Sequence, residues 1–128
     1  MRLERELMRG AGPIAVLQLL QEGEKYGYEL VQALSGRTNG VLAMGQSTLY
    51  PMLYNLEAKG LIRARWEQAS TGRKRKYYAL TDRGRKRLAR DTEQWRALAH
   101  AMASIGVVTR EALDAVRPTA AEAGEASA

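Results

Sequence analysis

The sequence contains no cysteine and no phenylalanine among its 128 residues. Without cysteine, a disulfide framework and a thiolate metal site are excluded. Without phenylalanine, a core must be built from aliphatic residues, methionine, tyrosine and tryptophan. No apolar run approaches the length of a membrane span, and the charged start MRLERELMRG lacks the apolar stretch of a signal peptide. These absences favour a single cytoplasmic domain that does not enter a membrane.

Patterns typical of enzymes and metal sites are also missing. The single histidine, His100, has no cysteine or carboxylate cluster beside it, so we interpret it as a surface residue and predict no metal and no cofactor. No nucleophile–base pair and no phosphate-cradling glycine loop is visible, so we assign no catalytic residue. An enzyme is therefore the least favoured class of function.

Positive charge is abundant and concentrated in one segment. The net charge is +6. Nine basic residues lie between 73 and 90, and only Asp82 opposes them within that range. This concentration suits a partner that carries phosphates, such as a nucleic acid. A solvated charged face is the simpler alternative.

Two helices are predicted in the first third of the chain. The stretch GPIAVLQLLQEG predicts a helix over about 12–22, with Pro13 in its first turn and Gly23 after its end. The charged segment before it has helical apolar spacing and is interpreted as a separate short helix. The stretch KYGYELVQALSGR predicts a second helix over about 26–36.

A third helix is predicted in QSTLYPMLYNLEAKG. Its apolar residues follow the i, i+3, i+4, i+7 rule and form one face, made of Leu49, Met52, Leu53 and Leu56. Pro51 lacks an N–H and is tolerated near a helix start. The N-cap is therefore expected at Ser47 or Thr48, whose hydroxyls accept hydrogen bonds from free amides.

The period of the pattern changes after Gly60. The stretch LIRARWEQ places Ile62, Ala64 and Trp66 on one side and charged residues on the other, which predicts a half-buried strand. The stretch KRKYYAL predicts the returning strand and ASTGR the turn, so the two strands form a β-hairpin. Thr81 is then expected to cap a long helix that continues to about residue 105.

The long helix carries an apolar seam between residues 88 and 105. Its members step mainly by three and four residues, a spacing that suits a partner helix. We therefore predict a homodimer interface made of Leu88, Trp95, Leu98, Met102 and Ile105.

Three helices, a hairpin and a further helix are the element order of a winged helix-turn-helix, a mainly α (α+β) fold. Three blocks of the chain resemble the PadR family of bacterial transcriptional regulators: YGYEL at 26–30, STLYPMLYNLEAKGLI at 47–62 and GRKRKYYALTDRGRKRL at 72–88. The single helix after the hairpin is similar to the short second subfamily. The resemblance implies a homodimeric repressor that binds promoter DNA and is often relieved by a small ligand.

The fold predicts how the chain is divided and where it meets DNA. We expect a winged domain at 1–80, a C-terminal dimerisation helix at 81–109 and a flexible tail at 110–128. In a winged helix-turn-helix the third helix enters the major groove and the hairpin is the wing. The predicted DNA contacts are Tyr28, Ser47, Thr48, Tyr50, Pro51, Tyr54, Asn55, Arg73, Lys74, Arg75 and Lys76.

Each of these contacts has a simpler alternative. The tyrosine face of the third helix is also consistent with ordinary helix surface, and the wing tip with a solvated loop. Arg63 and Arg65 are explained equally well by salt bridges with Glu67. For Tyr26 and Tyr28 we expect one ring in the core and one hydroxyl near a phosphate.

Trp95 has two interpretations. It either packs in the dimer interface or forms an aromatic plate for a small planar apolar effector, because Ala99 leaves room beside it and a two-fold axis would bring two such rings together. The leading function is a sequence-specific, ligand-responsive repressor. The alternative is a winged-helix module that binds protein or bulk nucleic acid without regulation by a ligand.

Overall fold

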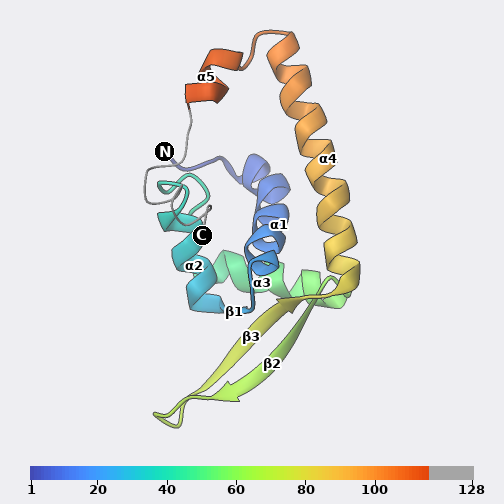
Figure 1. Ribbon diagram of the computed structural model, residues 1–128. Coiled ribbons are helices and arrows are strands. Elements are labelled where there is room, and N and C mark those ends of the chain that lie inside the picture. Colours follow the sequence, from blue (N-terminus) through green and yellow to red (C-terminus); the bar gives the residue numbers. More distant parts are fainter. Residues whose placement is uncertain (116–128) are drawn as a thin grey trace. The chain divides into compact units, whose positions relative to one another are not determined.

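The computed structural model describes residues 1–115 (Figure 1). In chain order its elements are α1 (Arg5–Gln21), β1 (Lys25–Tyr26), α2 (Gly27–Gly36), α3 (Gln46–Ala58), β2 (Ile62–Gln68), β3 (Lys74–Leu80), α4 (Asp82–Ser104) and α5 (Arg110–Ala115). Two compact units divide between Thr92 and Glu93, inside α4. None of the helices in the described part is long and apolar enough to cross a membrane. The predicted winged helix-turn-helix, mainly helical with one small sheet, is confirmed.

The core of the first unit lies where α1, α2 and α3 meet. The predicted leucine face of α3 is turned into it, with Leu49, Leu53 and Leu56 buried and Met52 partly buried. The helices α1 and α2 contribute further buried aliphatic side chains, namely Val16, Leu17, Leu19, Leu20, Leu30 and Leu34. This burial fixes which side of α3 faces outward.

The first helix is longer than predicted. A single helix runs from Arg5 to Gln21, so the expected separate short helix is wrong and Pro13 lies in the helix interior. Proline costs one hydrogen bond there, the one that the carbonyl of Arg9 would accept. Met8 and Val16, on either side of the proline, are both buried in the core. This packing on both sides holds the helix through the proline.

The start of α3 also differs from the prediction. The N-cap is Gly45 and no side chain caps the helix, so Ser47 and Thr48 lie inside the first turn. The amides of Thr48 and Leu49 donate instead to the carbonyl of Gly45, at 3.1 and 3.0 Å. Pro51 is the sixth residue of the helix. A missing N–H is without cost only in the first turn, where the N–H groups have no partner within the helix, and Pro51 lies about one turn later.

The predicted hairpin is present, and it belongs to a three-stranded antiparallel sheet in the order β1-β3-β2. The turn between β2 and β3 is closed by the amide of Ala69, which donates to the carbonyl of Arg73 at 2.7 Å. Gly72 in this turn has a φ of +85°, a conformation that favours glycine. The two-residue strand β1 was not predicted, because two residues are too few to show an alternation.

The hairpin extends beyond the helices of the first unit (Figure 1). Ile62 pairs with Leu80 at the inner end of the hairpin, and Trp66 pairs with Lys76 farther out. Ile62 is 2% exposed, but Trp66 is 64% exposed. Trp66 therefore shares the core-facing side of β2, as its position predicted, but the expectation that it is buried is wrong. Nothing in the helical core reaches that far along the strand.

The beginning of α4 is part of the first unit. Thr81 caps it as predicted, because its hydroxyl accepts a hydrogen bond from the amide of Gly84 at 3.0 Å. Leu88 is 3% exposed and belongs to the core of its own chain. The prediction that Leu88 lies in a dimer interface is therefore corrected, since its side chain is already covered.

The second unit contains the last turns of α4 and the short helix α5. The predicted end of the long helix near residue 105 is confirmed, and Gly106 follows it with a φ of +88°. The amide of Val107 donates to the carbonyl of Met102 at 2.9 Å, which closes this end. The predicted tail at 110–128 begins with α5. Its remaining part, from residue 116, lies outside the described residues.

Candidate nucleic-acid interface

The outward face of α3 carries the side chains predicted to contact DNA. Tyr54 is 73% exposed and Tyr50 is 44% exposed. The other predicted contacts on this helix are also exposed: Ser47, Thr48, Pro51 and Asn55. A face with two tyrosine rings, a proline and polar groups combines apolar contact area with hydrogen-bonding groups, as base edges in a major groove require.

The residues at the two borders of this face have different neighbours. Ser47 and Thr48 line a groove of about 760 Å³ together with Arg2, Arg5 and Arg9. These arginines were not among the predicted contacts, because no local pattern places the start of α1 beside the start of α3. Asn55 lines a separate cavity of about 370 Å³ with Arg9.

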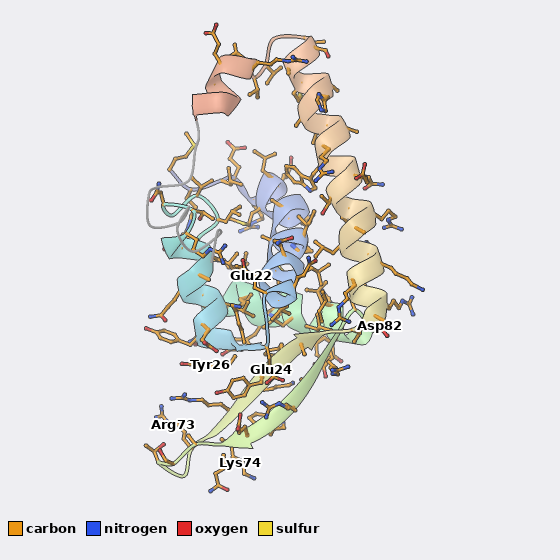
Figure 2. The ribbon with its side chains drawn as sticks, viewed as in Figure 1. Glu22, Glu24, Tyr26, Arg73, Lys74 and Asp82 are labelled. Atoms are coloured by element: carbon orange, nitrogen blue, oxygen red, sulfur yellow. The ribbon has the colours of Figure 1, made fainter. Side chains whose placement is uncertain are left out.

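The hairpin carries the basic side chains that the sequence predicted as DNA contacts. Arg73 and Lys74 lie at the far end of the hairpin (Figure 2). Arg73, Lys74 and Arg75 are exposed, whereas Lys76 is half-buried. The ammonium group of Lys76 lies 3.6 Å from a carboxylate oxygen of Glu57 on α3, so part of its charge is already balanced. Arg73, Lys74 and Arg75 therefore fit the predicted role of phosphate contacts better than Lys76 does.

Ion pairs on the opposite side of the sheet connect the hairpin to the segment between α1 and β1. The guanidinium of Arg65 donates to both carboxylate oxygens of Glu24, one of them at 2.8 Å from Nε, and to Glu67 at 3.1 Å. These hydrogen bonds from Arg65 lower the pKa of Glu24, and they raise the pKa of Arg65 itself. The salt-bridge interpretation of Arg65 is confirmed, with Glu24 as an additional partner.

Three tyrosines meet near the start of α2. Tyr28 is 50% exposed, and Tyr26 is half-buried, so neither ring is fully inside the core as had been expected for one of them. Gly27 between them lies against Tyr50, because a Cβ atom on Gly27 would stand 2.6 Å from the Tyr50 hydroxyl oxygen. The buried tyrosine is instead Tyr78, whose pKa is raised first by burial and then by the negative charge of Glu57.

The second unit exposes most of the predicted seam. Trp95 is 43% exposed, Leu98 44% and Ile105 76%, whereas Met102 is half-buried. Ala99 beside Trp95 is also exposed, and so is His100. Within residues 1–115, no cluster of three or more histidine, cysteine or acidic side chains is placed to hold a metal ion.

Comparison with known proteins gives relatives that match most of this chain. Residues 16–90, more than half of the chain, match the Transcriptional regulator PadR-like family. An uncharacterized protein of Lysinibacillus sphaericus is 37% identical over 90 residues, which are 70% of this chain and 83% of the relative.

Solved structures lead to the same family. A transcriptional regulator from Clostridium thermocellum is similar with a TM-score of 0.72 and 27% identity, over 79% of this chain and 98% of that one. A PadR family transcriptional regulator from Eggerthella lenta has a TM-score of 0.69 and 34% identity, over 78% and 85% of the two chains. The chain therefore belongs to the PadR-like family of transcriptional regulators, and it is a DNA-binding regulator of transcription, not an enzyme.

Proposed function

We propose that this regulator is a homodimeric repressor that reads its operator with α3 and holds the DNA backbone with the wing. The observation that carries this proposal is that α3 and the hairpin of the first unit expose different kinds of side chain. The helix α3 turns its leucines inward and its tyrosines outward, and a hairpin tipped with cations extends beyond the same core. Base contacts confer specificity, whereas phosphate contacts confer affinity.

The proposed DNA-binding residues fall into two groups. Tyr28, Ser47, Thr48, Tyr50, Pro51, Tyr54 and Asn55 form the helix group, and Arg73, Lys74, Arg75 and Lys76 form the wing group. The exposure of Tyr50 and Tyr54 supports the first group. The position of Arg73 and Lys74 at the hairpin tip supports the second (Figure 2).

The proposed dimer and its regulation involve the second unit. We place the interface at Trp95, Leu98, Met102 and Ile105, because three of these four apolar side chains are at least 43% exposed. A small planar apolar effector is proposed to bind beside Trp95 and Ala99 and to weaken DNA binding. The proposed compartment is the cytoplasm, where bacterial promoters are found.

The test compares binding to the chain's own promoter region with binding to an unrelated duplex of equal length at fixed salt. A specific repressor should prefer its own region by at least about a thousandfold. Tyr54→Ala should reduce this ratio, whereas Gln18→Ala, an exposed change on α1, should leave it intact. Equal affinity for both duplexes would favour a module that binds bulk nucleic acid without sequence preference.

A further inference from the structure

Three of the five methionines lie together where α1 meets α3. Met8 comes from α1, Met44 from the loop before α3 and Met52 from α3 itself. All three line the groove of about 760 Å³ beside Ser47 and Thr48. The chain contains no cysteine, so methionine sulfur is the group that a two-electron oxidant attacks most readily.

The side chain of Met52 fills the space between the two helices. Gly12 is buried on α1, and a Cβ atom on it would stand 2.6 Å from Cε and 3.1 Å from Sδ of Met52. The same Cβ atom would lie 3.4 Å from the methyl carbon of Met44. The missing side chain at Gly12 therefore makes room for the thioether of Met52 against the backbone of α1. A change in the size or polarity of this sulfur acts directly on the contact between α1 and α3.

Met52 is also the most accessible methionine of the three. It is partly exposed, whereas Met8 is 8% and Met44 is 5% exposed. Met52 lines the groove of about 760 Å³ and also the separate cavity of about 370 Å³. A small oxidant therefore reaches Met52 from two sides, while the other two methionines are covered.

Positive charge surrounds the larger groove. Arg2, Arg5 and Arg9 line it, and its lining residues, all between 2 and 52, include no acidic side chain. A hollow lined by charge of one sign raises the local concentration of small ions of the opposite sign. Hypochlorite is a small anionic oxidant of this kind, and it exchanges a proton rapidly with hypochlorous acid near neutral pH. The charge of the groove therefore favours this oxidant over a neutral peroxide.

We propose that Met52 is an oxidation site, which hypochlorous acid converts into methionine sulfoxide. The sulfur lone pair attacks chlorine, so that an S–Cl bond forms and hydroxide leaves. Water then adds to the sulfur and chloride leaves. One proton of that water neutralises the hydroxide and the other enters the solvent. Sulfur loses two electrons and chlorine gains two, and the net products are the sulfoxide, chloride and one proton.

The sulfoxide does not suit the space beside Gly12. It is polar and larger than the thioether by one oxygen atom, and a buried polar group without a hydrogen bond is unfavourable. Arg9 lines both hollows and carries N–H donors, so the oxidised side chain should turn toward Arg9 and leave the backbone of α1. Tyr50 and Tyr54 lie on the same helix as Met52, so DNA binding should weaken. This last consequence rests on the proposed function, whereas the oxidation does not.

The first experiment treats the full chain, without DNA, with increasing amounts of hypochlorous acid and locates the added oxygen by peptide mass spectrometry. Met52 should be oxidised at least about tenfold faster than Met8 and Met44, because oxidation follows accessibility. Met1, which is 96% exposed, gives the rate of a freely accessible methionine. Equal rates at Met8, Met44 and Met52, or no sulfoxide at Met52 while the chain stays folded, would overturn the proposed site.

The second experiment measures affinity for promoter DNA after this oxidation. The wild type should lose affinity about tenfold or more, and methionine sulfoxide reductases should restore it, because they reverse this one modification. Met52→Leu, which keeps an apolar side chain of similar volume, should resist the oxidant. Met44→Leu, the matched control in the same cluster, should remain as sensitive as the wild type. Met52→Gln, which places a polar side chain of similar length there, should bind DNA weakly without any oxidant.

The outcomes separate the oxidation site from its effect on DNA binding. Sensitivity that persists in Met52→Leu but is lost in Met102→Leu would assign the effect to the second unit and refute coupling through α3. If Met52 is oxidised first and promoter affinity does not change, the regulation is refuted while the oxidation site stands. If no promoter complex forms, the proposed function fails and the mass spectrometry still decides the site.

Discussion

At the scale of single residues, two glycines in helices of the first unit have opposite surroundings. A Cβ atom on Gly84 would stand 2.0 Å from the carbonyl oxygen of Leu61 and 2.8 Å from a methyl carbon of Leu80. The carbonyl belongs to the backbone and cannot turn aside. A Cβ atom on Gly10 would meet nothing within 4 Å. Gly84 thus permits α4 to begin directly against the end of α3 and the sheet.

We predict that Gly84→Ala lowers the free energy of unfolding by about 3 kcal/mol or more, because the added methyl group forces backbone apart. Gly10→Ala, the matched control inside α1, should instead raise it by about 0.5–1 kcal/mol, since alanine restricts the unfolded chain. Urea unfolding followed by circular dichroism measures both. Equal stability of the two variants would show that the contact between Gly84 and Leu61 is not as close as described.

At the scale of elements, the hairpin has two ends with different roles. Near the core, Ile62 and Leu80 are buried and fix the sheet to the helices. Farther out, the same side of the strands carries Trp66 and Lys76, which have no core to pack on. The ion pair between Glu24 and Arg65 holds the hairpin at the opposite side. The outer half therefore presents exposed side chains, such as Trp66, on the surface.

We predict that the double change Lys74→Ala and Arg75→Ala weakens binding to every duplex and lowers the salt slope of the binding constant by roughly one unit for each lost phosphate contact. Affinity measured at several salt concentrations gives this slope. The control is Arg85→Ala with Lys86→Ala, which removes the same charge from α4 and should leave the slope unchanged. An intact slope in the wing variant would exclude the wing from the DNA interface.

At the scale of the whole molecule, the second unit carries exposed apolar side chains that a partner could bury. Leu98, Ile105 and Val107 are each at least 44% exposed, although they are large and apolar. Contiguous exposed apolar side chains mark interaction sites. A second copy of the chain would satisfy the same residues on both sides of a two-fold axis.

We predict that Leu98→Glu combined with Met102→Glu yields monomers, because burying two new charges in a symmetric interface is unfavourable. Sedimentation measures the mass. His100→Glu adds a charge of the same sign to the other side of the same helix and should remain dimeric. A dimer that persists in the double variant would place the interface elsewhere.

The local pattern determined which segments form the elements and which side of each is apolar. The leucine spacing of α3 predicted its buried face and hence the exposure of Tyr50 and Tyr54, and the alternation after Gly60 predicted the hairpin. Thr81 was predicted as a cap from its position alone. These features depend on neighbours within a few residues, so the sequence was sufficient to predict them.

Only the tertiary structure decided what covers each apolar side. Pro13 stays within a helix because burial on both sides outweighs one lost hydrogen bond, and Leu88 is covered by its own core. Trp66 lies on the predicted side of its strand but is exposed, because the hairpin continues past the helices. The pairing of Arg65 with Glu24 spans 41 positions. Such contacts depend on the approach of segments that are distant in the sequence. The periodicity of a short stretch does not predict them.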